Sequence, residues 1–314
     1  MILRRFASCR GVIHHVHRPE GAINRAPAGL AWVLPITGII LLLVAGRGWE
    51  PWQRLLGATL GLLYLLKLTI FLKHRSTSAR RMPVSGILLF FSIWPGMDPS
   101  PFRAGRLSAG LDRSLLRRGI VWMTAGLGLL VCVAMAEPYL SPAWIGWMGV
   151  AALLMVIHLG YADVLAAAMR RAGWKVGPLF DQPFASGSLT DFWSRRWNLA
   201  FVEMDRLLFL RPLRRWFGRS GAILGVFVIS GLLHEMAVSY PAGAGWGTPF
   251  LYFAIHGFLV RFESHSVGFG QWPSLARRCW TYFWVLAPLP LLFHGPFRDR
   301  LIVPLYQTLN ELLR

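Results

Sequence analysis

Residues 221–240 read GAILGVFVISGLLHEMAVSY, and within this stretch only His234 and Glu235 carry an imidazole or a charge. A helix rises about 1.5 Å per residue, so a stretch of this length crosses the hydrocarbon core of a bilayer, which is about 30 Å thick. Ionisable groups inside such a span are costly, and they usually face other helices or a wet cavity. The stretch therefore predicts a transmembrane helix whose histidine is turned toward protein.

The composition of the whole chain agrees with a membrane location. Of its 314 residues, 55% are hydrophobic and only 15% are charged, which is too few charges to cover a soluble globular domain. Six further apolar runs have the composition of membrane helices: residues 29–46, 53–72, 119–136, 143–169, 248–262 and 279–294. We expect an all-α polytopic membrane protein, a bundle of about 7–9 transmembrane helices.

Two segments are apolar but not clear spans. Residues 84–96 are too short to cross and end at Pro95-Gly96, which indicates a re-entrant or interfacial piece. Residues 299–314 have apolar positions at helical spacing, as in a short amphipathic helix or a tilted partial span. The predicted organisation is a basic cytoplasmic arm at 1–28, followed by one membrane-embedded domain at 29–314.

The net charge of +19 would suggest a nucleic-acid partner in a soluble protein. Here the basic residues lie between the apolar runs, where the positive-inside rule expects them, so a nucleic-acid partner is not indicated. If the N-terminus is cytoplasmic, basic residues gather in the cytoplasmic segments before residue 29, in 73–118, in 170–219 and in 261–278. The loops 137–142 and 241–247 then carry none. We expect a multi-pass protein of the bacterial cytoplasmic (inner) membrane.

Between residues 170 and 219 the chain is expected to stay on the cytoplasmic side, and its centre, 188–206, reads SLTDFWSRRWNLAFVEMDR. At helical spacing Trp193 and Trp197 share an apolar face, which predicts an interfacial amphipathic helix with its tryptophans at headgroup depth. Arg195 and Arg196 are either topology determinants or a site for a phosphate-bearing donor such as a coenzyme thioester. Asn198, on the polar face, is either an exposed surface residue or a substrate contact.

His234 is the strongest catalytic candidate. A buried neutral imidazole can accept a proton, which suits a general base that deprotonates an alcohol. Ser230 and Gly231, four and three residues earlier, share its face and leave room beside the ring. That space is either a substrate groove or a helix-packing contact, and the sequence leaves both open.

Other polar residues inside the apolar runs have structural alternatives. His256 and Glu263 share a helix face, either lining the same cavity or forming a structural hydrogen bond. His158 and Asp163 are interpreted as satisfied interior polar groups. The three cysteines form no CxxC or Cys/His spacing and the histidines form no set of spaced boxes, so neither a metal site nor a membrane di-iron oxygenase is expected.

With these residues in view, the sequence resembles the membrane-bound O-acyltransferase (MBOAT) superfamily and, within it, the wax-synthase-like branch. Four pieces carry the resemblance: WPGMDP at 94–99, SLTDFWSRRWN at 188–198, SGLLHE at 230–235 and YFAIHG at 252–257. The resemblance implies a helical bundle with a tunnel, in which the acyl donor enters from the cytosol and the acceptor from the bilayer or the far side. It also implies acyl-CoA as co-substrate and no further cofactor.

The resemblance implies the site residues as well. His234 would be the base, and Asn198 would position the substrate or stabilise developing charge. The residues expected to bind substrate are Trp193, Arg195, Arg196, Trp197, Ser230, Gly231, Glu235 and His256. The implied reaction is esterification of a long-chain alcohol or lipid-borne hydroxyl by an enzyme embedded in the lipid bilayer. The oligomeric state of the enzyme stays unknown.

Two alternatives stay open beside this interpretation. The first is a small-acyl transferase acting on a glycan or natural product, although residues 204–214, MDRLLFLRPLR, depart from the block that follows in the glycan-acetylating branch. The second is a transporter or flippase in which His234, His256 and Asp163 line a polar pathway. Transporters often show related halves, and no internal repeat is evident in this sequence.

Overall fold

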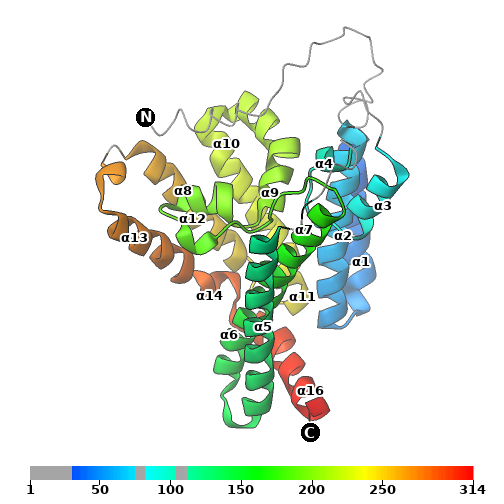
Figure 1. The fold of residues 1–314 in the computed structure, drawn as a ribbon, viewed down its shortest axis with the longest axis vertical. Coiled ribbons are helices and arrows are strands. Elements are labelled where there is room, and N and C mark those ends of the chain that lie inside the picture. The colour runs from blue at the N-terminus through cyan, green and yellow to red at the C-terminus, as the bar shows by residue number, and fades with distance from the viewer. Residues whose placement is uncertain (1–29, 75–81, 104–109, 111, 267, 314) are drawn as a thin grey trace.

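The computed structural model describes residues 30–74, 82–103, 110, 112–266 and 268–313, and these residues form helices and loops without a strand (Figure 1). The predicted basic arm at 1–28 lies outside the described residues. On one side, α1 (Leu30–Ala45) and α2 (Pro51–His74) form a pair joined by a tight turn. The short helices α3 (Val84–Ser92) and α4 (Ser100–Arg103) lie near the end of α2.

A second layer pairs α5 (Arg113–Ala136) with a continuous helix made of α6 (Pro142–Leu153), the π-helix η5 (Leu154–Tyr161) and α7 (Ala162–Arg171). The Asp112 carboxylate accepts the backbone N–H of Leu115 at 3.0 Å and so caps the start of α5. A Cβ at Gly160 would lie 2.7 Å from Met123 Cα. Small residues therefore let these two helices approach closely, as is common in membrane bundles.

The candidate motifs lie on a long, repeatedly bent path from α8 to α12. Its elements are α8 (Leu189–Asp191), η7 (Phe192–Arg196), α9 (Leu199–Met204), η8 (Asp205–Phe209), α10 (Leu210–His234), η9 (Glu235–Ser239), α11 (Tyr240–Ala242) and α12 (Thr248–His265). Gly218, at φ 67°, breaks the course of α10. Beyond this kink α10 packs along α12, so the histidine stretch quoted first lies against the YFAIHG stretch.

The C-terminal part closes the bundle. It comprises α13 (Ser274–Leu286), α14 (Leu289–Leu292), α15 (Gly295–Phe297), η11 (Arg298–Ile302) and α16 (Val303–Leu313). Buried side chains of α16 and η11, such as Tyr306 and Ile302, pack against α5 and α6 in one of three apolar clusters. The predicted span 279–294 was wrong, because α13 ends at Leu286 and the chain turns through Pro288 before α14.

Among the described residues, four helical stretches are long and apolar enough to cross a membrane: 51–73, 113–139, 142–171 and 199–242. A shorter apolar helix covers 35–48. These stretches confirm the predicted all-helical, multi-pass membrane protein. The number of 7–9 spans and the re-entrant nature of 84–96 stay predictions, although α3 is a nine-residue helix, too short to cross.

The predicted interfacial helix around 190–208 was wrong. The helix stops at Trp197, and Asn198 adopts the left-handed conformation, φ 46° and ψ 63°, before a new helix begins at Leu199. Trp193 and Trp197 are half-buried and pack against other aromatic rings of the protein. These ring contacts favour the break in the helix, because aromatic side chains contribute large apolar contact areas.

Candidate active site

His234 lies at the last residue of α10, with its Nδ1 atom 2.7 Å from the carbonyl oxygen of Ser230. In this geometry Nδ1 carries the proton and donates it to the carbonyl, which leaves the lone pair of Nε2 available as an acceptor. The ring packs on Phe253, at 4.2 Å between centroids, and on Phe201, at 5.5 Å. The imidazole of His234 is therefore held in a fixed orientation between apolar walls.

Asn198 occupies the break between η7 and α9. Two backbone hydrogen bonds, each 2.8 Å, hold the segments around it: Asp181 N–H to Arg196 O, and Leu199 N–H to Leu179 O. Within the described part of the chain the Asn198 side-chain amide has no hydrogen-bond partner. Non-glycine residues in the left-handed region cost about 1–2 kcal/mol, and asparagine tolerates it best. Such local strain clusters at functional sites.

The structure brings the segments of Asn198 and His234 to one aromatic cluster. The backbone N–H of Phe201 is hydrogen-bonded to Asn198 O at 2.9 Å, and its ring packs on His234. The residue before Asn198, Trp197, is stacked on His158, with centroids 6.2 Å apart and 8° between the planes. The two candidates implied by the resemblance thus border the same cluster.

His158 is a member of this cluster that sequence reasoning missed. It lies in η5, its ring contacts Phe180 at 5.3 Å, and it is near enough to His234 for the two imidazoles to interact electrostatically. Its Nδ1 is buried and has no hydrogen-bond partner among the described residues, so its interpretation as a satisfied group was wrong. The interpretation is confirmed for Asp163, which binds Arg118 Nε at 2.5 Å. In the sequence, His158 was marked only by its position inside a predicted membrane span.

Helical segments around the site contain π-helical turns. They are η5 with His158, η7 with the Phe-Trp-Ser-Arg-Arg sequence, η8 and, directly after His234, η9. A π turn adds a residue to the helical turn and so shifts the side chains that follow it. Such turns occur frequently at functional sites. Four of the five π-helical elements of the described residues lie between Leu154 and Ser239, the part of the chain that carries His158, Asn198 and His234, and the fifth, η11, lies near the C-terminus.

Three glutamates bind backbone N–H groups far away in the sequence. Glu203 Oε2 accepts from Met97 and Asp98, at 2.7 and 3.0 Å. Glu235 Oε1 accepts from Gly247 and Phe250, at 3.0 and 2.9 Å. Glu263 accepts from Leu189 and Thr190, at 2.8 and 2.9 Å. Hydrogen bonds to an ionised acceptor are roughly twice as strong as neutral ones, so these carboxylates fix three of the stretches that carry the resemblance, at 94–99, 188–198 and 230–235, to other segments of the chain.

The carboxylate of Glu235 forms a contact within the protein. Its Oε1 holds the start of α12, where free N–H groups favour a negative charge. Its Oε2 is buried and has no hydrogen-bond partner among the described residues. Its predicted contact with substrate stays a prediction, and its contact with α12 is a finding.

Trp193 and His256 pack together, at 5.2 Å between rings, and His256 is fully buried with its Nδ1 2.8 Å from Tyr252 O. Trp193 also touches Phe253, which in turn contacts His234. These two residues therefore support the wall behind the base, and whether they also touch substrate stays a prediction.

Gly231 serves helix packing. A Cβ there would lie 3.0 Å from Phe250 Cα on α12, so of the two open alternatives the structure shows the packing contact. Ser230 takes part through its backbone carbonyl, which binds His234.

The two arginines of the motif differ. Arg196 binds Asp191 through Nε at 2.6 Å and points Nη1 at the carbonyls of Asp181 and Gln182, so these two nitrogens are used within the chain. Arg195 has a side chain that is 56% exposed and lies 3.8 Å from Asp191. Arg195 is therefore the more accessible of the pair to a ligand.

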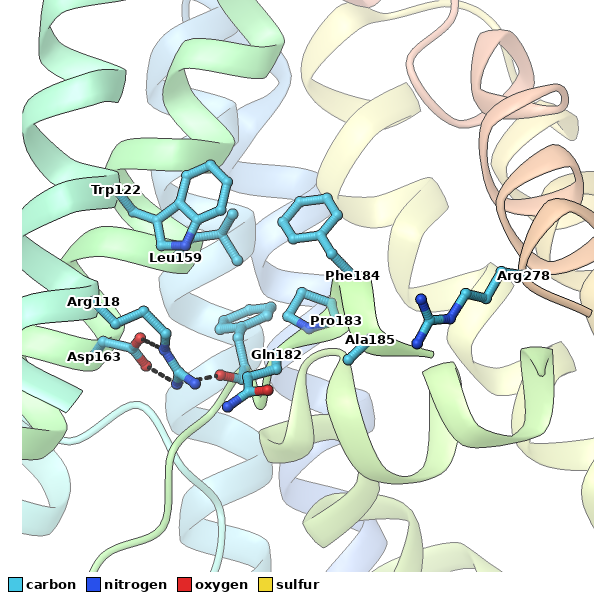
Figure 2. Close-up of a pocket in the computed structure, with 10 residues that line it drawn as sticks. Arg118, Trp122, Leu159, Asp163, Gln182, Pro183, Phe184, Ala185 and Arg278 are labelled. Carbon is cyan, nitrogen blue, oxygen red and sulfur yellow. Dashed lines mark hydrogen bonds and ion pairs between the residues drawn. The ribbon is translucent and has the colours of Figure 1, made fainter. Parts of the chain in front are cut away.

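A cavity of about 360 Å³ opens beside the 180–185 loop (Figure 2). Its walls are formed by residues of α5, of η5 and α7, of the loop and of α13: Arg118, Trp122, Leu159, Asp163, Phe180, Gln182, Pro183, Phe184, Ala185 and Arg278. The cavity does not include His234. Phe180 lines the cavity and also contacts His158 and Trp197 of the aromatic cluster. Volumes of this size, roughly 300–1,000 Å³, are typical of ligand sites.

Comparisons with known proteins match this region. Residues 174–255 match the family described as "Membrane bound O-acyl transferase family". Over 120 residues the chain is 34% identical to a long-chain-alcohol O-fatty-acyltransferase of Simmondsia chinensis, with 34% of each chain covered. Over 96 residues it is 38% identical to a probable long-chain-alcohol O-fatty-acyltransferase of Arabidopsis thaliana, with 28% of each chain covered. The resemblance found from the motifs is confirmed.

The name of a third relative contains a sterol acceptor instead of a long-chain alcohol. Over 100 residues the chain is 33% identical to an acyl-CoA–sterol O-acyltransferase of Arabidopsis thaliana, with 28% of this chain and 29% of the relative covered. The chain therefore spans about a third of the length of the curated relatives it matches. All three of these relatives are plant proteins.

Proposed function

We propose that this membrane protein, whose residues 174–255 are those of the membrane bound O-acyl transferase family, is an acyl-CoA-dependent O-acyltransferase. The observation that carries the proposal is the state of His234: its Nδ1 is bound to Ser230 O, its Nε2 is left as an acceptor, and the matched segment surrounds it. A base so held can take the proton of a hydroxyl in a site without water.

The proposed reaction uses His234 as base. Its Nε2 accepts the proton of the acceptor hydroxyl while the oxygen attacks the thioester carbonyl carbon. The Asn198 amide, which has no partner within the described part of the chain, donates to the carbonyl oxygen as negative charge develops on it. The carbon–sulfur bond then breaks, the thiolate takes the proton from the imidazolium, and the products are the ester and the free thiol of coenzyme A.

A hydrophobic acceptor suits the surroundings of the base. Phe201 and Phe253 form the walls beside the imidazole, and the short connection at 241–247 beyond it carries no charge. A charged glycan would find no ionic partner among these groups. We therefore propose a long-chain alcohol or lipid-borne hydroxyl as acceptor and a long-chain acyl-CoA as donor, giving a wax-type ester. The names of the relatives support this choice.

The test is an esterification assay on the purified full chain in detergent. Radiolabelled palmitoyl-CoA or acetyl-CoA is supplied with a panel of 1-alkanols, a sterol and a soluble sugar, and the labelled ester is separated by chromatography. Wax-type activity predicts ester from palmitoyl-CoA and long alkanols. Ester from acetyl-CoA and the sugar alone would assign the protein to the small-acyl alternative, and no ester from any pair would contradict the enzyme.

A transporter or flippase is the second candidate function, and one observation weakens it. Asp163, one of the three groups that would line its polar pathway, is bound by Arg118 through both carboxylate oxygens. Full burial of His256 removes a second group from any water-filled path. The location in the bacterial cytoplasmic membrane stays a prediction.

A further inference from the structure

The cavity beside the 180–185 loop carries a positive charge that the protein does not neutralise. Arg278 on α13 is exposed, and no ion pair within the described part of the chain uses it. Figure 2 shows its guanidinium reaching toward Ala185 from the side of the cavity opposite Arg118. Arg118 is the second positive group, but its charge is compensated within the chain by Asp163, to which it is bound, and by Asp181, whose Oδ1 lies 3.8 Å from Nη1, so Arg278 supplies the free positive charge.

Aromatic rings lie at the same cavity. Trp122 of α5 and Phe184 of the loop are stacked, with centroids 5.4 Å apart and an angle of 29° between their planes. Phe184 is 58% exposed, although it is apolar, and the Tyr282 hydroxyl donates to its backbone carbonyl and so fixes the loop. A planar base stacks on such rings, and a guanidinium fork binds phosphate, so the wall has the donors and surfaces that a nucleoside phosphate requires.

Backbone hydrogen bonds and a ring contact connect the wall of the cavity to the proposed reaction site. The hydrogen bonds from Asp181 N–H to Arg196 O and from Leu199 N–H to Leu179 O place the start of the loop beside Asn198. Between these bonds, Phe180 lines the cavity with one side and packs on Trp197 at 5.0 Å with another. A thin, extended ligand anchored in the cavity needs to pass only this aromatic layer to reach the cluster around His234.

We infer that this cavity binds the nucleotide end of the acyl donor, with Arg278 on a phosphate and the Trp122–Phe184 pair against the base. The inference rests on the proposed function, because it assigns one end of the same substrate. The thioester end then points past Phe180 toward Asn198 and His234. Arg118, the 180–185 loop and Arg278 belong to segments predicted to face the cytoplasm, where coenzyme A is found, and Trp122, Leu159 and Asp163 belong to the parts of the predicted spans that adjoin them.

The experiment compares donors that do and do not carry a nucleotide. Arg278→Gln removes the charge from an exposed side chain, Phe184→Ala removes the stacking ring and keeps the loop carbonyl, and Arg171→Gln at the end of α7 is the matched exposed control. With long-chain acyl-CoA, Arg278→Gln is expected to raise KM roughly 10- to 100-fold with kcat unchanged, the factor given by one lost charge-assisted hydrogen bond. With the corresponding acyl-N-acetylcysteamine thioester, which has no nucleotide, Arg278→Gln and wild type should behave alike.

A binding measurement separates this inference from the proposed function. Adenosine 3′,5′-bisphosphate is titrated into the full chain in a nonionic, lipid-free detergent, where no phospholipid headgroup competes. Wild type and Arg171→Gln should bind it, and Arg278→Gln and Phe184→Ala should bind it at least tenfold more weakly. Binding without any ester formation would leave the cavity assignment and overturn the reaction. Equal KM values for acyl-CoA in Arg278→Gln and wild type, or binding only of an anionic phospholipid, would overturn the cavity assignment.

Discussion

The Nδ1 atom of His234 lies 2.7 Å from the carbonyl oxygen of Ser230, one turn earlier in the same helix. This bond fixes both the tautomer and the ring orientation of the proposed base without a carboxylate partner. Glu235, the next residue, is turned away and binds the backbone at the start of α12. The helix backbone itself therefore prepares His234 for proton transfer.

His234→Ala should lower ester formation by about 10²- to 10⁴-fold, the usual contribution of a general base. Folding should persist, because the change removes a partly buried ring and leaves the Ser230 carbonyl within its helix. Turnover of labelled acyl-CoA and the melting temperature in detergent are measured together. The matched control is His265→Ala, which removes an exposed histidine from the end of α12. A folded His234→Ala protein with near-normal turnover would disprove the role of this residue.

At position 198, comparing a glycine with an alanine substitution separates the role of the amide from the role of the backbone conformation. Because φ is 46°, Asn198→Gly removes the amide at little conformational cost, whereas Asn198→Ala adds about 1 kcal/mol of backbone strain. We expect both variants to lose turnover and only Asn198→Ala to lose stability. Thermal melts and turnover of the two variants provide the comparison. Normal turnover in Asn198→Gly would show that Asn198 only permits the turn and that its amide takes no part in the reaction.

Glu263→Gln should destabilise the protein without touching the proposed reacting atoms. The carboxylate accepts from Leu189 N–H, from Thr190 N–H and Oγ–H, and from Trp280 Nε1–H at 3.1 Å. Loss of its charge should cost about 1.5–3 kcal/mol, since hydrogen bonds to charged groups are worth that much. Chemical denaturation in mixed micelles measures the difference. Glu311→Gln on the exposed face of α16 is the control and should change stability by less than about 0.5 kcal/mol.

The chain length of the acceptor should control the specificity of the enzyme. Each added methylene that is buried contributes up to about 0.8 kcal/mol, so kcat/KM should rise up to roughly fourfold per methylene and then reach a plateau when the tunnel is full. A series of 1-alkanols at fixed palmitoyl-CoA gives the profile. A maximum at ethanol or butanol would contradict a hydrophobic acceptor.

The topology follows from the distribution of basic residues and can be tested by labelling single cysteines in a cysteine-free background. Cysteines at the exposed positions Arg195 and Ser274 should react only from the cytoplasmic side, and those at Ser141 and Trp246 only from outside. An impermeant maleimide applied to intact and to opened cells distinguishes the two. Reaction of position 195 from outside would place the donor site on the side without coenzyme A.

The helical spans were predictable because their signal is local. Residues 53–72 and 143–169 are apolar over the length of a bilayer, and the structure places helices at 51–73 and 142–171. His234 was also predictable, since a histidine within such a run is costly wherever the helix lies. The Asp163 ion pair agrees with the same reasoning. None of these predictions needed to know which helices are neighbours.

The interrupted motif helix and His158 were not predictable in this way. The periodicity around Trp193 and Trp197 describes one uninterrupted amphipathic helix, whereas the structure bends the chain at Asn198 and both rings pack against residues far away in the sequence. His158 joins the site only because η5 and the 179–182 segment lie beside the motif. Contacts between distant segments leave no trace in the pattern of one segment.

By itself, the sequence determined a helical membrane protein, its main spans and a histidine inside one of them, because hydrophobic length and the cost of a buried ionisable group act residue by residue. Only the tertiary structure decided that Glu203, Glu235 and Glu263 fix segments distant in the sequence, and that a cavity opens beside the 180–185 loop with Arg278, which forms no ion pair with a described residue, in its wall. Hydrogen bonds and cavities depend on distances between segments, which are fixed when the whole bundle packs.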